Sequence, residues 1–311
     1  MYLIKQKPEE FIVKEVSNIK VNDKGDYIYF LLKKTNYNTI DAIKRIADAL
    51  HIPSARFGFA GNKDRKAITE QLISIKGVKK ENLNNLKLKD IEIQHIGYGD
   101  KYISLGELEG NKFTITIRNL NDHDIGNFKN KIEKKPILMP NYFGEQRFSE
   151  KNADIGRSII KKEFEKASEL LNLDIGGNDF IGALRKTDRK LLRLYVHAYQ
   201  SLIFNNTINK YIRFKKDNEK IPIMGFGTEL ENYPAKLREI IQDILKKEDI
   251  DVREFITTKI PELSQEGNER DLFIEIKDLE ILEEKDDVVK IKFFLQKGSY
   301  ATEAVKFLFQ M

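Results

Sequence analysis

Strand-like segments lie near both ends of this chain, and helix-like segments lie between them. Residues 27–34 are rich in β-branched and aromatic side chains, and residues 113–118 alternate apolar with polar side chains, as strands do. Similar strand patterns return at 272–276 and 288–295. Chain ends that both supply strands commonly meet in one sheet. The order of segments therefore predicts a domain inserted into another domain.

We expect residues 1–154 and 276–311 to form one α+β domain, and residues 155–275 to form a mainly helical α/β insert. Within these domains Thr39 is the expected N-cap of the first helix. A later helix carries an apolar stripe of Leu191, Leu194, Tyr195, Tyr199, Leu202 and Ile203. The helices that the spacing of apolar residues predicts are 40–50, 152–172, 187–212 and 234–247.

Composition excludes several classes of protein. The 311 residues are 41% hydrophobic and 33% charged, which is typical of a folded globular chain. There is no cysteine, so disulfides, thiolate nucleophiles and thiolate metal sites are excluded. The histidines have no metal-ligand spacing. No apolar run approaches the roughly 20 residues of a membrane span, so we expect a cytoplasmic protein. The net charge of +5 permits an RNA partner without requiring one.

The segment with the most distinctive chemistry is Gly61-Asn62-Lys63-Asp64-Arg65-Lys66-Ala67. It places one carboxylate among three cations in a glycine-bearing turn, and we expect residues 60–67 to form a loop between two strands. An aspartate in such a turn also commonly caps or bonds its own backbone. The segment lacks the glycine-lysine spacing of a phosphate-binding loop, so a nucleoside triphosphate site is rejected.

Two motifs carry a resemblance to a known family. Residues 59–71 resemble the Gly-x-Lys-Asp-x-x-Ala-x-Thr-x-Gln signature of the tRNA pseudouridine synthase D (TruD) family, and residues 141–148 match its second motif, Asn-Tyr-Phe-Gly-x-Gln-Arg-Phe. Further landmarks in family order lie at 5–11, 105–111, 197–205 and 298–302. The resemblance thus extends over almost the whole chain, and it is to an archaeal type of member.

The resemblance implies an isomerase, an intramolecular transferase that converts uridine to pseudouridine in tRNA. The usual target of the family is uridine 13 of the D arm. The implied fold is a catalytic domain of the pseudouridine synthase type, with a mixed and largely antiparallel sheet, into which a TRUD domain is inserted. It further implies no cofactor, no metal, a tRNA partner and no membrane partner, and we expect a monomer.

The resemblance also assigns site residues. Asp64 matches the catalytic aspartate, and Lys5 matches the basic residue that pairs with it. Asn141 and Phe143 match residues that line the uridine pocket, where a phenyl ring can stack on uracil and an amide can read its edge. Without the family, an exposed lysine, a turn asparagine and a core phenylalanine would be the ordinary interpretations. Residues expected to orient the loop or contact RNA are Lys63, Arg65, Gln71, Gln146 and Arg147.

The sequence leaves the reaction route open. The carboxylate of Asp64 can attack C1′ of the ribose, stabilise positive charge there, or remove a sugar proton to form a glycal. Two other functions also remain. A non-catalytic RNA-binding or RNA-folding module could use the same pocket. A methyltransferase is a second alternative, against which the absence of a recognisable glycine-rich cofactor loop argues.

Overall fold

The computed structural model describes residues 2–149, 151–215 and 217–310. The chain divides into two compact units: unit 1 comprises Met1–Ile137 and Glu275–Met311, and unit 2 comprises Leu138–Ile274. Both ends of the chain therefore contribute to unit 1. The segment 138–154, which we expected to belong with the chain ends, groups with unit 2. Whether the two units act as a catalytic and an inserted domain stays a prediction.

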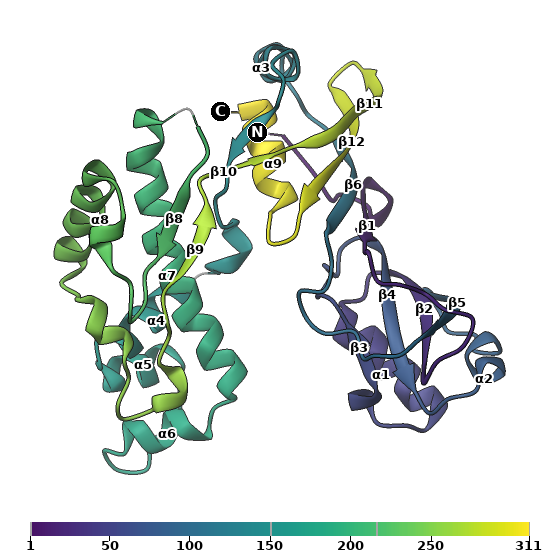
Figure 1. Cartoon of the computed structure of the whole chain (residues 1–311), viewed down its shortest axis with the longest axis horizontal. Coiled ribbons are helices and arrows are strands. Elements are labelled where there is room, and N and C mark those ends of the chain that lie inside the picture. Colours follow the sequence, from purple (N-terminus) through teal and green to yellow (C-terminus); the bar gives the residue numbers. More distant parts are fainter. Residues whose placement is uncertain (1, 150, 216, 311) are drawn as a thin grey trace. The chain divides into compact units, whose positions relative to one another are not determined.

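Unit 1 is built on an eight-stranded sheet, counted over the described residues. The strand order is β11-β12-β6-β1-β4-β2-β5, and β3 pairs with β4. β1 runs parallel to β4, while every other neighbouring pair is antiparallel. The predicted mixed, largely antiparallel sheet is thus confirmed (Figure 1). The strands are β1 Phe11–Val16, β2 Tyr27–Thr35, β3 Phe57–Phe59, β4 Ile68–Lys76, β5 Ile91–Gly99, β6 Gly110–Ile117, β11 Lys277–Lys285 and β12 Val288–Gln296.

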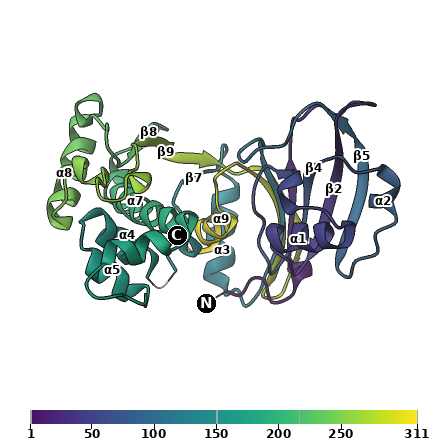
Figure 2. The ribbon, with the colours of Figure 1, turned by 90° about the horizontal axis from the view of Figure 1, so that it is seen from below.

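Helices pack against this sheet and against each other. Ile43 and Ile46 of the first helix are buried with Phe30 of β2 in one apolar cluster, and Figure 2 shows that helix lying over β2 and β4. Two further helices meet through the rings of Phe128 and Phe309, which stack with centroids 4.6 Å apart. The helices of unit 1 are α1 Thr39–Leu50, α2 Lys80–Asn84, α3 Asp122–Ile132 and α9 Ala301–Gln310.

The predicted N-cap of α1 is wrong by one residue. The side chain of Asn38 accepts a hydrogen bond from the backbone N–H of Asp41, so Asn38 is the cap. The hydroxyl of Thr39, which is fully buried, instead donates to Gln71 of β4. Both residue types are good caps, and the tertiary hydrogen bond decides between them.

Unit 2 is mainly helical, as predicted, and its core surrounds the long helix α7. Two short sheets complete it: β8 pairs antiparallel with β9 (Figure 1), and β7 pairs with β10. Each helical region predicted for this part of the chain contains at least one helix. The elements are β7 Leu138–Pro140, α4 Asn152–Ile160, α5 Phe164–Leu170, α6 Phe180–Lys186, α7 Arg189–Tyr211, β8 Lys220–Ile223, α8 Ala235–Glu248, β9 Asn268–Asp271 and β10 Phe273–Glu275.

Two sequence predictions fail in unit 2. The helix expected at 152–172 is two helices, because the backbone of Lys162 is left-handed, with φ of 59°, and ends the run. The stripe expected on α7 is buried at Tyr195, Tyr199 and Ile203, but the prediction is wrong at its first two residues. Leu191 and Leu194 are each 39% exposed, whereas Leu192 and its neighbours on the same face are buried.

Candidate active site

The predicted loop at 60–67 connects β3 to β4, and buried side chains hold its backbone. Gln71 of β4 donates from Nε2 to the carbonyl oxygen of Gly61 at 3.0 Å. Its Oε1 accepts from the Thr39 hydroxyl at 2.7 Å, and the hydroxyl oxygen accepts from the backbone N–H of Lys63 at 2.9 Å. Leaving a buried polar group without a partner costs about 1–3 kcal/mol, so this chain of bonds fixes the loop.

Asp64 forms an ion pair with Lys5, the residue predicted as its partner. The Lys5 ammonium lies 2.6 Å from Oδ2 of Asp64, and their side chains are 20% and 37% exposed. The same ammonium lies 4.0 Å from the centroid of the Phe11 ring. Lys5 has a left-handed backbone with φ of 59°, which is uncommon for a lysine. The preceding segment is held by a two-bond bridge between Leu3 and Arg118 of unit 1.

A second lysine lies beneath the loop, and the sequence did not single it out. Lys34 is fully buried at the end of β2, where its ammonium donates to the carbonyl oxygens of Asp64, at 3.1 Å, and of Tyr37. Burial disfavours the charged form and lowers the pKa of Lys34 to about 8. The negative charge of Asp64 opposes this shift, and the positive charge of Lys63 adds to it. Lys34 thus fixes the backbone of the residue whose side chain Lys5 holds.

Lys63 is directed into unit 1. Its ammonium lies 2.6 Å from Oε2 of Glu15 on β1, with side-chain exposures of only 5% and 2%, and donates to Oδ1 of Asn111 at 2.9 Å. Of the roles predicted for Lys63, this geometry is compatible with orienting the loop. Arg65, by contrast, is exposed, so its guanidinium is available to solvent-borne groups such as phosphate.

Asn141 of unit 2 is only 3% exposed, and its polar groups are engaged. Its backbone N–H donates to the carbonyl oxygen of Leu272 at 2.9 Å, and its side-chain Nδ2 donates to the carbonyl oxygen of Asp271 at 3.0 Å. Its Oδ1 accepts from Nη2 of Arg270 at 2.5 Å, while Nε of Arg270 donates to its backbone oxygen at 3.0 Å. The side-chain amide is therefore held by an acceptor, the Asp271 carbonyl oxygen, on one side and by a donor, the Arg270 guanidinium, on the other.

Phe143 lies two residues further on and is anchored through its backbone. Asn205 of α7 accepts from the Phe143 N–H and donates to its carbonyl oxygen, both at 2.9 Å. The Phe143 ring meets Phe204 edge to face, with centroids 5.3 Å apart. The guanidinium carbons of Arg270 and Arg147 lie 4.3 Å and 5.7 Å from the ring centroid. The ring is thus partly buried between cations and an aromatic neighbour.

The remaining predicted residues of this motif lie in the 3₁₀ helix Glu145–Arg147. Gln146 is exposed. Arg147 is half-buried, and its Nε donates to the Ser201 hydroxyl at 3.4 Å. That hydroxyl donates in turn to the carbonyl oxygen of His197, whose imidazole pKa is lowered, chiefly by burial and further by nearby arginines. Arg147 is therefore tied to α7 and also lies beside Phe143.

The predicted site residues thus form two clusters. The loop cluster of unit 1 brings together Lys5, Asp64 and Gln71, and the pocket cluster of unit 2 brings together Asn141 and Phe143. Residues that the sequence analysis did not assign to the site are Glu15, Lys34, Asn205 and Arg270. A signal for Lys34 was present, because side chains two apart on a strand share a face, and Lys34 follows the buried Phe30 and Leu32 at that spacing.

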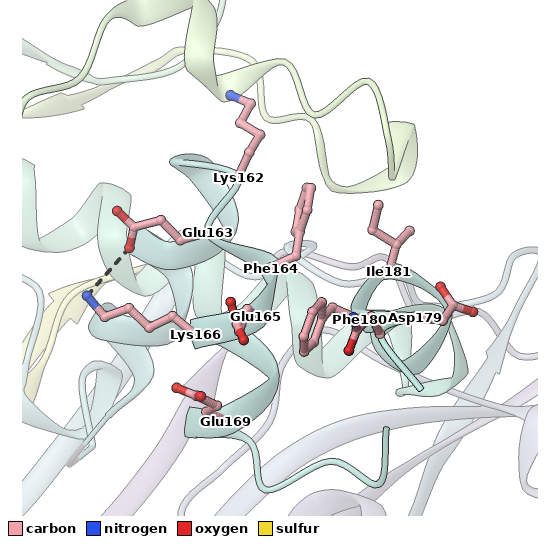
Figure 3. A pocket seen from close by; sticks show the side chains of 10 residues that line it. Lys162, Glu163, Phe164, Glu165, Lys166, Glu169, Asp179, Phe180 and Ile181 are labelled. Carbon is pink, nitrogen blue, oxygen red and sulfur yellow. Dashed lines mark ion pairs between the residues drawn. The ribbon is translucent and has the colours of Figure 1, made fainter. Parts of the chain in front are cut away.

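An open pocket of about 850 Å³ lies in unit 2, away from these motifs in sequence (Figure 3). Its lining comes from α5, α6 and the residues that precede them, and Lys166 forms an ion pair with Glu163 at 3.5 Å. The described lining residues carry more acidic than basic side chains, an excess that disfavours a phosphate backbone there. They are Lys162, Glu163, Phe164, Glu165, Lys166, Glu169, Asn178, Asp179, Phe180 and Ile181.

Two other kinds of feature are not found in residues 2–149, 151–215 and 217–310. No helix there is long and apolar enough to cross a membrane. No group of three or more histidine, cysteine, aspartate or glutamate side chains is placed to hold a metal ion.

Comparison with known proteins decides the family. The model of the family described as tRNA pseudouridine synthase D (TruD) matches residues 2–176, 170–222 and 214–306. The chain belongs to this family. A Nanoarchaeum equitans protein named probable tRNA pseudouridine synthase D is 30% identical, over 98% of this chain and 98% of that protein. The Aquifex aeolicus tRNA pseudouridine synthase D is 29% identical, over 98% and 97%.

A solved structure has the same fold. The crystal structure of a Methanosarcina mazei protein, a TruD candidate, superposes with a TM-score of 0.76 and covers 99% of this chain and 93% of that one. The identity is 24%, so this likeness concerns the fold alone. The family membership that the two motifs predicted is confirmed.

Proposed function

We propose that this chain isomerises uridine to pseudouridine in tRNA, with Asp64 as the catalytic carboxylate. The observation that carries the proposal is the 2.6 Å ion pair between Asp64 and Lys5, in a TruD family member whose Asp64 loop is anchored by buried hydrogen bonds. The proposal extends to uridine 13 of the D arm as the target. It includes a cytoplasmic monomer that needs no cofactor or metal, with residues 1–154 and 276–311 as the catalytic domain and residues 155–275 as the inserted domain.

The reaction breaks the bond between ribose C1′ and uracil N1 and forms a bond between C1′ and C5. C5 loses its proton and N1 gains one, so the atoms balance without a co-substrate. Asp64 assists at the sugar by attack on C1′, by stabilising its positive charge, or by removing a sugar proton. Each route needs an ionised carboxylate, and the Lys5 ammonium offsets the cost of covering that charge with a base.

Asn141 and Phe143 receive the uracil in this proposal. A nucleotide drawn out of its helix loses stacking worth a few kcal/mol, and stacking on an aromatic ring returns roughly 1–3 kcal/mol. The two hydrogen bonds between the Asn205 side chain and the Phe143 backbone support this role, because they fix the backbone that carries the Phe143 ring. Arg65, which is exposed beside Asp64, is the candidate for an RNA phosphate contact.

The test uses unmodified tRNA transcripts without added cofactor, and pseudouridine is mapped by carbodiimide treatment and primer extension. We expect the wild type to convert one uridine and Asp64→Asn to convert none. Asp286→Asn is the matched control, since Asp286 is exposed in a turn, and it should convert the transcript fully. Conversion by Asp64→Asn would remove Asp64 from its role.

The same variant separates the alternative function. An RNA-binding module needs the pocket but not the carboxylate. If Asp64→Asn restored the cellular effect of a deleted gene, and the wild type converted no transcript, the binding module would replace the enzyme as the conclusion.

A further inference from the structure

One side chain contacts both residues of the predicted uridine pocket. Arg270 bonds the backbone and side-chain oxygens of Asn141 and lies over the Phe143 ring, with its guanidinium carbon 4.3 Å from the centroid. Its own backbone is held in register in the ladder of β9 with β8, opposite Ile221. Arg270 therefore links the two pocket residues to a fixed strand.

The chemistry of these contacts sets the direction of the Asn141 amide. A guanidinium has only donors, so it meets the amide oxygen and never the amide nitrogen. On the other side the carbonyl oxygen of Asp271 has only acceptor capacity, so it meets Nδ2. Rotating the amide by half a turn would set Nδ2 against the Arg270 guanidinium, donor against donor. It would also set Oδ1 against the Asp271 carbonyl oxygen, acceptor against acceptor. The oxygen and nitrogen positions of Asn141 are thus fixed by Arg270 and Asp271 together.

A fixed amide distinguishes two pyrimidines that a rotating amide accepts equally. Uracil presents a donor at N3 beside an acceptor at O4, whereas cytosine presents an acceptor at N3 beside an amino donor. An amide oxygen has a second lone pair, and an amide nitrogen a second hydrogen, for such an edge. A base seated against this amide excludes water from it, so a mismatched edge leaves a donor or an acceptor without a partner.

We propose that Arg270 is a positioning residue that locks the Asn141 amide in the orientation that accepts uracil and rejects cytosine. The inference rests on the proposed function, in which the target base binds at Asn141 and Phe143. It makes Arg270 a determinant of base specificity that acts through Asn141.

The experiment measures base preference in a protein that binds without turnover. In the Asp64→Asn background, dissociation constants are measured by fluorescence anisotropy for two tRNA transcripts that carry U or C at the target position. We expect the U transcript to bind about tenfold more tightly, as a paired hydrogen-bond contact to a base edge allows. In Arg270→Met the ratio should fall, because Asp271 alone then holds the amide and the Asn141 oxygen has lost its donor.

A merely structural role would give a different result. Loss of general support for the pocket weakens both transcripts equally and leaves their ratio at the value of the parent protein, and this result would overturn the proposal. Arg253→Met, at an exposed arginine of unit 2, is the control and should keep the ratio. Arg270→Lys serves if Arg270→Met does not fold: one ammonium cannot reproduce both contacts, so an intermediate ratio is expected and an unchanged ratio overturns the proposal.

Failure of the proposed function is recognised separately. If the wild type with an intact Asp64 converts no uridine in either transcript, the assignment of the pocket to a target uridine fails, whatever the ratio. If the wild type converts the U transcript and Arg270→Met keeps the full preference for U, only the role of Arg270 is overturned.

Discussion

The loop cluster of unit 1 and the pocket cluster of unit 2 hold their key residues in opposite ways. At Asp64 the backbone is fixed, through Lys34 and the loop bonds of Gln71, while the side chain stays 37% exposed with one ion pair. At Asn141 the side chain itself is fixed, by Arg270 and Asp271, and the residue is 3% exposed.

The difference matches the two tasks that a base-modifying site must perform. A carboxylate that attacks, or takes a proton, needs an accessible oxygen and a backbone that does not move away. An amide that recognises a base needs a fixed direction, and accessibility to solvent would weaken it. Variants that remove one kind of support therefore test whether the two clusters have these two tasks.

The largest effect is expected where the only ion pair of the Asp64 carboxylate in the described structure is broken. Lys5→Met removes the ammonium 2.6 Å from Oδ2 and should lower kcat by roughly 10²-fold, the usual loss for one electrostatic contact at a reacting group. Turnover is measured on a single tRNA transcript under saturating conditions. Lys7→Met, at an exposed lysine of the same segment, should leave kcat unchanged. Wild-type turnover by Lys5→Met would show that the pair is not used.

A smaller loss is expected when the loop backbone is released and the ion pair is kept. Gln71→Met has a similar shape but leaves Gly61 and Thr39 without their partner. We expect the free energy of unfolding to fall by about 1–3 kcal/mol, measured by urea denaturation, with a lower kcat. Gln94→Met, at an exposed glutamine of β5, is the control. A stability loss without any loss of kcat would contradict the view that backbone anchoring serves Asp64.

The smallest effect concerns pH. Burial lowers the pKa of Lys34 to about 8, below its ordinary value of 10.5. Between these values the unfolded chain holds a proton that the folded chain has released, so this group makes the free energy of unfolding rise with pH. Below about pH 8 both states are protonated, and the full cost of the buried charge is present.

We therefore expect the stability of the wild type, minus that of Lys34→Met, to increase between about pH 7 and about pH 10. The measurement is urea denaturation at several pH values in that range. Lys33→Met, on the exposed side of the same strand, should give a difference that stays constant. A constant difference for Lys34→Met would mean that Lys34 is buried without its charge being disfavoured.

Much of the fold could be predicted because local patterns and tertiary packing agree. The strand at 27–34 was predicted from its β-branched and aromatic side chains and the helix at 40–50 from its periodicity, and both exist with bounds within about one residue. The errors arise where tertiary contacts decide. Thr39 resembles a cap, but its hydroxyl is taken by Gln71. The helix break at Lys162 could not be predicted, because no glycine or proline lies there in the sequence.

The candidate site was predictable where it is encoded in continuous motifs. The loop with Asp64 and the segment with Asn141 and Phe143 were recognised from consecutive residues. Arg270 was not, because it is one cation in a short charged strand and lies 129 residues from Asn141. Only folding brings the two together, so no local pattern reveals the contact.

The buried pair of Glu15 and Lys63 has a consequence for how this protein can evolve. Replacing either partner alone leaves an uncompensated charge in the interior, which typically costs about 3–5 kcal/mol, much of the stability of an ordinary domain. Single substitutions at either position are thus strongly disfavoured. Descendants of this chain should keep both residues or exchange both, so the two positions should co-vary.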